Sequence, residues 1–213
     1  MTRSFAQGDD PRRHAPPGPV HSLAAYRRRP DNEERTARVG MAVFLGSWAM
    51  LFVALFFAYA FVRAGAPQWP PLDAPPLPRL VPGLNTLVIA LSSAAVMRAV
   101  RASELGRLAR AGRALATAAV LGAIFISLQA AVWTELWHQG LEPSSGPFGS
   151  VFYAFTAFHA LHVLVGLAAL AWLATWLQSP APIRPRIRVR LWGWYWHFVG
   201  AVWAVLYLTV YLA

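Results

Sequence analysis

The chain has 213 residues, of which 57% are apolar and only 13% are charged. Because soluble domains carry about 25% charged residues, this composition indicates a membrane protein. The absence of cysteine excludes disulfides, iron–sulfur clusters, thiolate nucleophiles and covalent c-type haem attachment within the chain. The formal net charge is +10, and all 19 basic residues are arginines. Their positions, given below, fit membrane topology and do not indicate nucleic-acid binding.

Residues 1–38 are polar and contain five prolines and the arginine clusters Arg12-Arg13 and Arg27-Arg28-Arg29. Such a segment has too little apolar surface to form a core, so we expect a disordered cytoplasmic tail rich in arginine and proline. The first apolar run is too long for the apolar region of a secretory signal, and no small-residue cleavage site follows it. The remaining residues, 39–213, are expected to form one transmembrane domain.

Five apolar segments follow the tail, and each is long enough, or nearly long enough, to cross a membrane as a helix. We expect spans at about residues 39–62, 80–97, 114–137, 148–177 and 191–213. At a rise of about 1.5 Å per residue, about 20 residues cross a hydrocarbon layer about 30 Å thick. The sequence therefore predicts an all-α integral membrane bundle of five transmembrane helices.

The arginines predict the orientation of these spans. The tail holds 8 arginines, the connection between the second and third spans holds 5, and that between the fourth and fifth holds 4. The other two connections hold only Arg63 and Arg79. Since cytoplasmic loops are enriched in arginine, the N-terminus is expected in the cytoplasm and the C-terminus in the periplasm.

Tryptophan and tyrosine mark the two expected membrane interfaces. By their positions in the spans, Trp192, Trp194 and Trp196 are expected at the inner interface, and Trp69, Trp137 and Tyr211 at the outer one. The first outer connection carries seven prolines between Pro67 and Pro82, so we expect it to be stiff and extended.

Three histidines lie well inside the spans. His159 and His162, spaced i, i+3, share nearly one face of the fourth span. From the helix rise, His162 and His197 both lie about 21 Å from the outer ends of their spans, so they can face each other or a shared partner. They could be haem or metal ligands, part of a proton or solute pathway, or neutral groups that hydrogen-bond between helices. The third interpretation is preferred because no carboxylate lies mid-membrane.

The other polar residues of the spans have simpler explanations. Glu135, the only acidic residue in any span, is near an outer end and is expected to reach interfacial water or headgroups, not His162. Asn85 opens the second span, where a helix N-cap role suffices. Ser92 suits close helix packing, and Gln129 is expected to bond a neighbouring helix.

Several of these residues together resemble subunit III of the haem–copper oxidases, in its shorter five-helix bacterial form. The resemblance extends from residue 39 to the C-terminus. Four sequence blocks, in order and at matching spacing, carry it: Asn85-Thr86 with Leu91-Ser92-Ser93; Gln129, Trp133 and Gly140 with residues 145–153; residues 156–163 with Gly166; and residues 195–199 with Trp203 and Tyr207.

The resemblance implies a subunit of a respiratory terminal oxidase in the bacterial inner membrane. Such a subunit carries no haem or copper, packs against the catalytic subunit I with subunit II in the same complex, binds phospholipids, and supports stability and proton uptake. It implies no catalytic, cofactor-binding or metal-binding residue here. It also suggests that the first two spans form one wall and the last three another, with lipid between them. Residues expected to make structural, lipid or subunit contacts are His159, His162, His197, Gln129, Glu135, Tyr153, Trp196, Asn85, Ser92 and Arg98.

Departures from the family pattern concern its intramembrane acids. Trp48, Val132 and Gly200 stand where the family has acidic residues, while both signature histidines remain. Because buried charges can be lost together at little cost, we expect a role in scaffolding and lipid packing. Alternatives left open are an accessory subunit of a quinol oxidase or nitric oxide reductase, a cytochrome b-like haem protein, and a small transporter.

Overall fold

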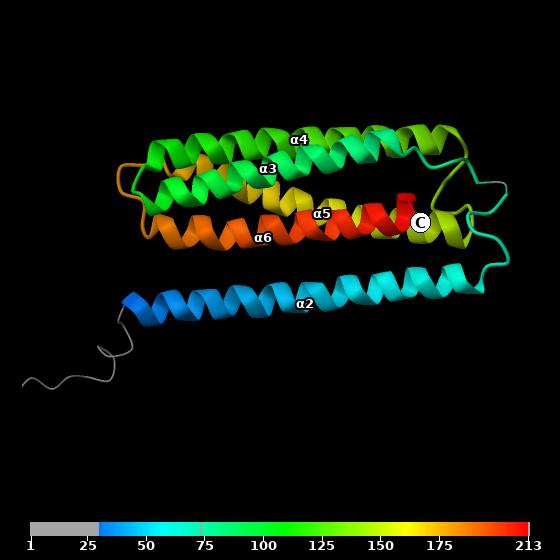
Figure 1. The fold of residues 1–213 in the computed structure, drawn as a ribbon, viewed down its shortest axis with the longest axis horizontal. Coiled ribbons are helices and arrows are strands. Elements are labelled where there is room, and N and C mark those ends of the chain that lie inside the picture. Colours follow the sequence, from blue (N-terminus) through cyan, green and yellow to red (C-terminus); the bar gives the residue numbers. More distant parts are fainter. Residues whose placement is uncertain (1–29, 73, 213) are drawn as a thin grey trace, which may run out of the picture. The chain divides into compact units, whose positions relative to one another are not determined.

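The computed structural model describes residues 30–72 and 74–212, and this part of the chain contains helices and loops but no β-strand. The elements are α2 (Pro30–Gly65), α3 (Leu80–Glu104), α4 (Leu108–His138), α5 (Pro147–Trp176), α6 (Pro185–Leu206) and the short π-helix η2 (Tyr207–Leu212), which continues α6 (Figure 1). Five helical segments of the described residues are long and apolar enough to cross a membrane. The predicted all-α fold with five spans is therefore confirmed.

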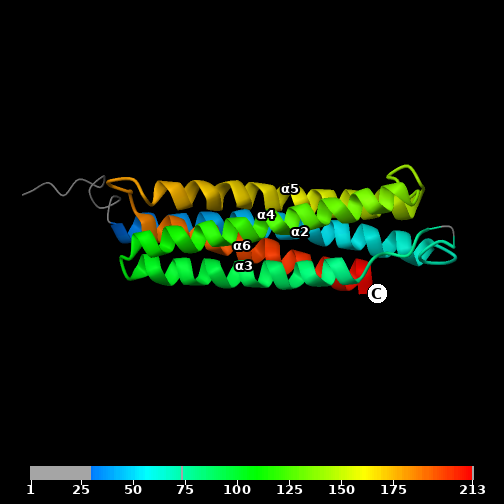
Figure 2. The ribbon, with the colours of Figure 1, turned by 90° about the horizontal axis from the view of Figure 1, so that it is seen from above.

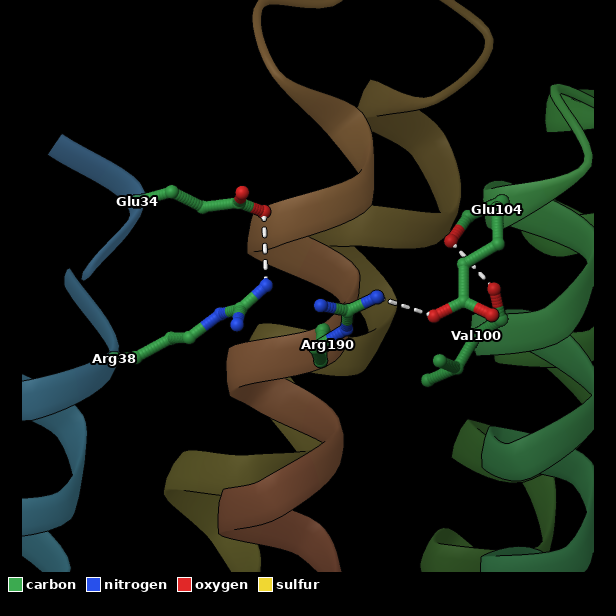
Figure 3. A network of polar contacts seen from close by, with 6 residues as sticks. Glu34, Arg38, Val100, Glu104 and Arg190 are labelled. Carbon is green, nitrogen blue, oxygen red and sulfur yellow. Dashed lines mark hydrogen bonds and ion pairs between the residues drawn. The ribbon is translucent and has the colours of Figure 1, made fainter. Parts of the chain in front are cut away.

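Helix α2 begins earlier than the predicted first span. Its first turns contain a proline at the start, where no backbone N–H is needed, and acidic residues that favour a helix N-terminus. Glu34 and Arg38, one turn apart, form an ion pair at 3.4 Å (Figure 3). The prediction of disorder is thus wrong for residues 30–38, and residues 1–29 lie outside the described part of the chain.

The chain divides into two units, residues 1–39 and residues 40–213. Within the second unit, α3 packs along both α4 and α6, and α5 packs along the same two helices (Figures 1 and 2). The four helices therefore form a bundle in which α3 is diagonal to α5. Small side chains are buried on α3 and α4, including Ala95, Ala99, Ala111 and Ala118. Such residues let membrane helices approach closely.

The part of α2 from Gly40 onward reaches the bundle through aromatic side chains. Four of them, spaced by four residues, lie on one face of α2: Phe44, Trp48, Phe52 and Phe56. Their ring centroids lie 4.3–6.4 Å from rings of α5 and α6. No close backbone packing against another helix accompanies these contacts among the described residues. The expected two-wall arrangement is therefore wrong, because α3 belongs to the same bundle as α4 and α6.

Candidate functional site

His162 lies between α5 and α2, among aromatic rings. Its Nδ1 is 2.7 Å from the carbonyl oxygen of Phe158, one turn earlier. Because a carbonyl only accepts, the proton of this bond belongs to Nδ1. The rings of Trp48 and Phe52 stand edge-on to the imidazole at 4.3 and 5.3 Å between centroids. Edge-to-face packing of this kind is favourable, so Trp48, which stands where the resemblance leads one to expect an acid, packs against His162.

His159, one turn earlier on α5, lies inside the four-helix bundle. Its side chain is 1% exposed. The nearest rings of the bundle belong to Phe125 of α4, at 6.2 Å, and Trp203 of α6, at 5.6 Å. Within the described part of the chain, neither ring nitrogen of His159 has a hydrogen-bond partner. His159 also lies 6.3 Å from the ring of Phe52 of α2, which His162 contacts as well, so the two signature histidines share one neighbour, as their spacing predicts, while His159 also reaches α4 and α6.

His197 lies on the α3 side of α6. It is half-buried and lines a groove of about 310 Å³ with side chains of α3 and α6, among them Met97, Arg101, Glu104 and Trp194. Beside it, Arg190 of α6 forms an ion pair with Glu104 (Figure 3). His162 faces α2 instead, so the expectation that these two histidines meet or share a partner is wrong. Equal depth does not bring side chains together when they point to different neighbours.

Trp196 connects three helices at the centre of the bundle. Its Nε1–H donates to Ser92 Oγ at 3.1 Å, and Ser92 Oγ–H donates to the carbonyl oxygen of Ala118 at 2.8 Å. The indole also lies against two glycines: a Cβ added at Gly122 or at Gly166 would be 2.8 Å from its ring atoms. Trp196 is fully buried. Its predicted place in an interfacial belt is therefore wrong, because its side chain points into the bundle.

Two buried amides make bonds between helices. Gln129 Nε2 of α4 donates to Tyr211 Oη of η2 at 3.2 Å, the kind of neighbouring-helix bond that the sequence predicts. Tyr211 is 3% exposed, so its ring faces the protein. Asn85 Nδ2 donates to the carbonyl oxygen of Phe125 at 3.2 Å. Because α3 begins at Leu80, Asn85 lies within the helix, and the N-cap prediction is wrong.

The remaining predicted residues lie apart from these clusters. Tyr153 Oη donates to the carbonyl oxygen of Leu141 at 2.8 Å and so fastens the α4–α5 loop to α5. Glu135 is exposed in the last turns of α4, where it accepts a hydrogen bond from Gln139. Arg98 is exposed on α3. The structure therefore distributes these residues along the helices and does not gather them into one site.

Two of the positions where the family pattern has an acid, Val132 and Gly200, are packed against other side chains. Val132 is 4% exposed. A Cβ added at Gly200 would lie 3.5 Å from Ser93 Oγ and 3.7 Å from Ile89, in ordinary contact. Among residues 30–72 and 74–212, no group of three or more His, Cys, Asp or Glu side chains could hold a metal ion. These residues therefore hold neighbouring helices together through hydrogen bonds and aromatic ring contacts.

Two features were not predicted from the sequence. They are the packing of Trp196 against Gly122 and Gly166, and the aromatic face of α2. Gly122 carried no signal by itself, since its importance depends on the opposing side chain. The aromatic face could have been found, because Phe44, Trp48, Phe52 and Phe56 recur at i, i+4, the spacing of one helix face.

Comparison with known proteins adds independent evidence. The family model described as cytochrome c oxidase subunit III matches residues 31–213. A cytochrome c oxidase subunit 3 of Synechocystis sp. is 32% identical over 175 residues, covering 81% of this chain and 74% of that protein. A probable cytochrome c oxidase subunit 3 of Nocardia farcinica is 34% identical over 197 residues, covering 90% and 91% of the two chains. The subunit 3 of Cyprinus carpio is 34% identical over 185 residues, covering 84% and 70%. With its five spans and signature histidines, this chain belongs to the cytochrome c oxidase subunit III family.

Proposed function

We propose that this chain is the non-catalytic subunit III of a proton-pumping cytochrome c oxidase in aerobic electron transport. The complex would pass electrons from cytochrome c to oxygen, with haem and copper held by partner chains. The observation that carries this proposal is the family match over residues 31–213. Residues 39–213 would be the membrane domain of the subunit.

The interior of the bundle supports a structural role. Its buried polar side chains are used to join helices, as in the path from Trp196 through Ser92 to Ala118. Hydrogen bonds and close packing of small residues are the main forces that associate helices in lipid. A bundle fixed in this way suits a rigid flank that stabilises the catalytic subunit.

We infer that the main partner is subunit I, with subunit II in the same complex and phospholipids bound at the surface. The outward face of α2 offers apolar area for this purpose: Met50, Phe57 and Phe61 are 73–76% exposed. The exposed Arg98 and the arginines at the same end of the bundle suit anionic headgroups.

We propose the bacterial inner membrane as the location, with the N-terminus in the cytoplasm and the C-terminus in the periplasm. The arginine-rich connections on one side support this orientation. The chain has no cysteine, so single reporters can be added cleanly. In cells whose outer membrane is permeabilised and whose inner membrane is intact, a membrane-impermeant maleimide should label Ser144→Cys in the α4–α5 loop. It should not label Ser179→Cys in the α5–α6 loop. The opposite labelling pattern would reverse the orientation.

The function itself is tested by purification and deletion. A tagged chain should bring down haem- and copper-containing oxidase subunits, identified by mass spectrometry. The complex made without it should still reduce oxygen but lose activity faster on storage or turnover. Isolation of the chain alone from native membranes, with no oxidase partner, would contradict the proposal. A Soret band in the isolated chain, lost on His162→Ala, would support the cytochrome b-like alternative.

A further inference from the structure

Four buried polar atoms of the four-helix bundle have no hydrogen-bond partner among residues 30–72 and 74–212. They are both ring nitrogens of His159, Oδ1 of Asn85 and Oε1 of Gln129. The three side chains are 0–2% exposed and come from α5, α3 and α4 respectively. An unsatisfied polar group is especially costly inside a membrane, where bulk water cannot replace the missing partner. A cluster of such atoms therefore requires an explanation.

One turn of α4, residues 125–129, carries Gln129 and adjoins Asn85 of α3 and His159 of α5. Asn85 touches this turn directly, because its Nδ2 donates to the carbonyl oxygen of Phe125 at 3.2 Å. The imidazole of His159 lies beside the ring of Phe125, at 6.2 Å between centroids. Gln129 follows Phe125 by four residues and so lies on nearly the same helix face. The three side chains with unpartnered atoms thus lie at or beside the same turn of α4.

Direct bonds among these atoms cannot satisfy all of them. A neutral imidazole has one N–H donor and one acceptor nitrogen, and the two amide oxygens only accept. One donor therefore stands against three acceptors, and pairing it would leave two acceptors unsatisfied. A water molecule supplies two donors and can also accept from the imidazole. Buried waters in proteins typically make about three hydrogen bonds to groups that are otherwise unsatisfied.

We propose that the bundle holds an internal water site between α3, α4 and α5, in which at least one ordered water bonds His159, Asn85 Oδ1 and Gln129 Oε1. The rings of Phe125 and Trp203 lie beside this site. His159 holds the water that completes the hydrogen bonds of the two amides, which explains a histidine at a position without protein partners. The proposal stands independently of the oxidase assignment.

In the purified complex, the direction of the Tm change on His159→Phe distinguishes a site that holds water from one that does not. With the water present, His159→Phe removes the ring nitrogen that bonds it and leaves the water with only its two amide contacts, so Tm should fall by at least about 2–4 °C. His159→Gln keeps a donor and an acceptor, so it should lie closer to the wild type. With no water, His159→Phe removes only unsatisfied atoms, and Tm should stay unchanged or rise. His138→Phe, the same change at the exposed end of α4, is the control and should have no effect.

A map of the intact complex at a resolution that shows water gives the direct test. We expect density within hydrogen-bond distance of at least two of the three side chains. Side chains bonded directly to one another with no density between them would overturn the proposal, as would a His159→Phe complex at least as stable as the wild type. If the His159→Phe chain does not assemble into the complex, the density map of the wild type and the Tm of the His159→Gln variant test the proposal.

Discussion

Gly166 is the position where a single methyl group tests the packing of the bundle most sharply. A Cβ at this residue would lie 2.8 Å from Cε3 and 3.0 Å from Cζ3 of Trp196, and 3.0 Å from a ring carbon of Tyr195. Carbon atoms pack at about 3.5–4.0 Å, so the new methyl is too close by about 0.5–1.2 Å. The indole has little room to move, because Gly122 is packed against its Cη2 and Cζ2 atoms and Ser92 accepts its N–H.

Gly166→Ala should therefore destabilise the chain by about 1–3 kcal/mol, the usual cost of overpacking a core. A change of this size corresponds to a Tm drop of about 2–12 °C for a domain of this length. The intrinsic helix propensity acts in the opposite direction, by up to about 1 kcal/mol, because alanine favours a helix more than glycine does. A net loss thus requires that the steric contact outweighs this gain.

The assay is thermal unfolding of the purified complex, followed by tryptophan fluorescence. The matched control is Gly46→Ala, the same change within α2, where an added Cβ meets nothing within 4 Å. This control should be neutral or slightly stabilising. Trp196→Phe removes the outer indole ring, so its combination with Gly166→Ala should cost less than the sum of the single changes. A Gly166→Ala protein as stable as the Gly46→Ala control would refute the reasoning.

Three further changes test other contacts. Ser92→Ala removes the acceptor of the Trp196 N–H and should cost about 1–3 kcal/mol, measured as a fall in Tm, because it leaves a buried donor unsatisfied. Val132→Glu restores the acid of the family pattern at a buried position, where a carboxylate is costly, and should lower both the yield and the Tm of the complex, without raising oxygen consumption or proton uptake. Glu104→Gln breaks the partly exposed ion pair with Arg190 and should change stability by only about 0.2–1 kcal/mol, an effect that high salt removes.

Each of these changes has a control or a contrary outcome. Ser127→Ala is the control for Ser92→Ala, because the Ser127 hydroxyl is exposed and bonds only within its own helix. A substantial rise in turnover or proton uptake on Val132→Glu would contradict the scaffold role. If Glu104→Gln lowered the Tm as much as Ser92→Ala does, the ion pair beside His197 would contribute more to stability than its partial exposure indicates.

The sequence by itself determined the five spans and their approximate depths. Long apolar runs must be helices in a membrane, because only a helix satisfies its own backbone within one segment. Depth follows from counting residues along the helix axis. Because a polar side chain in the hydrocarbon layer needs a partner within the protein, the sequence also predicted that Gln129 would bond another helix, as it does with Tyr211. The start of α2 was misplaced because hydropathy detects the membrane and not the polar turns that extend a helix beyond it.

Only the tertiary structure decided which way each side chain points. His159 and His162 both adjoin Phe52 of α2, yet His159 also adjoins rings of α4 and α6, whereas His162 adjoins Trp48 of α2. Trp196 was expected in an interfacial belt, yet its indole lies at the centre of the bundle against two glycines. A position along a helix is fixed by the chain alone, whereas the neighbour on each face depends on how all the helices pack. That is why the sequence located the polar residues of this protein but not their partners.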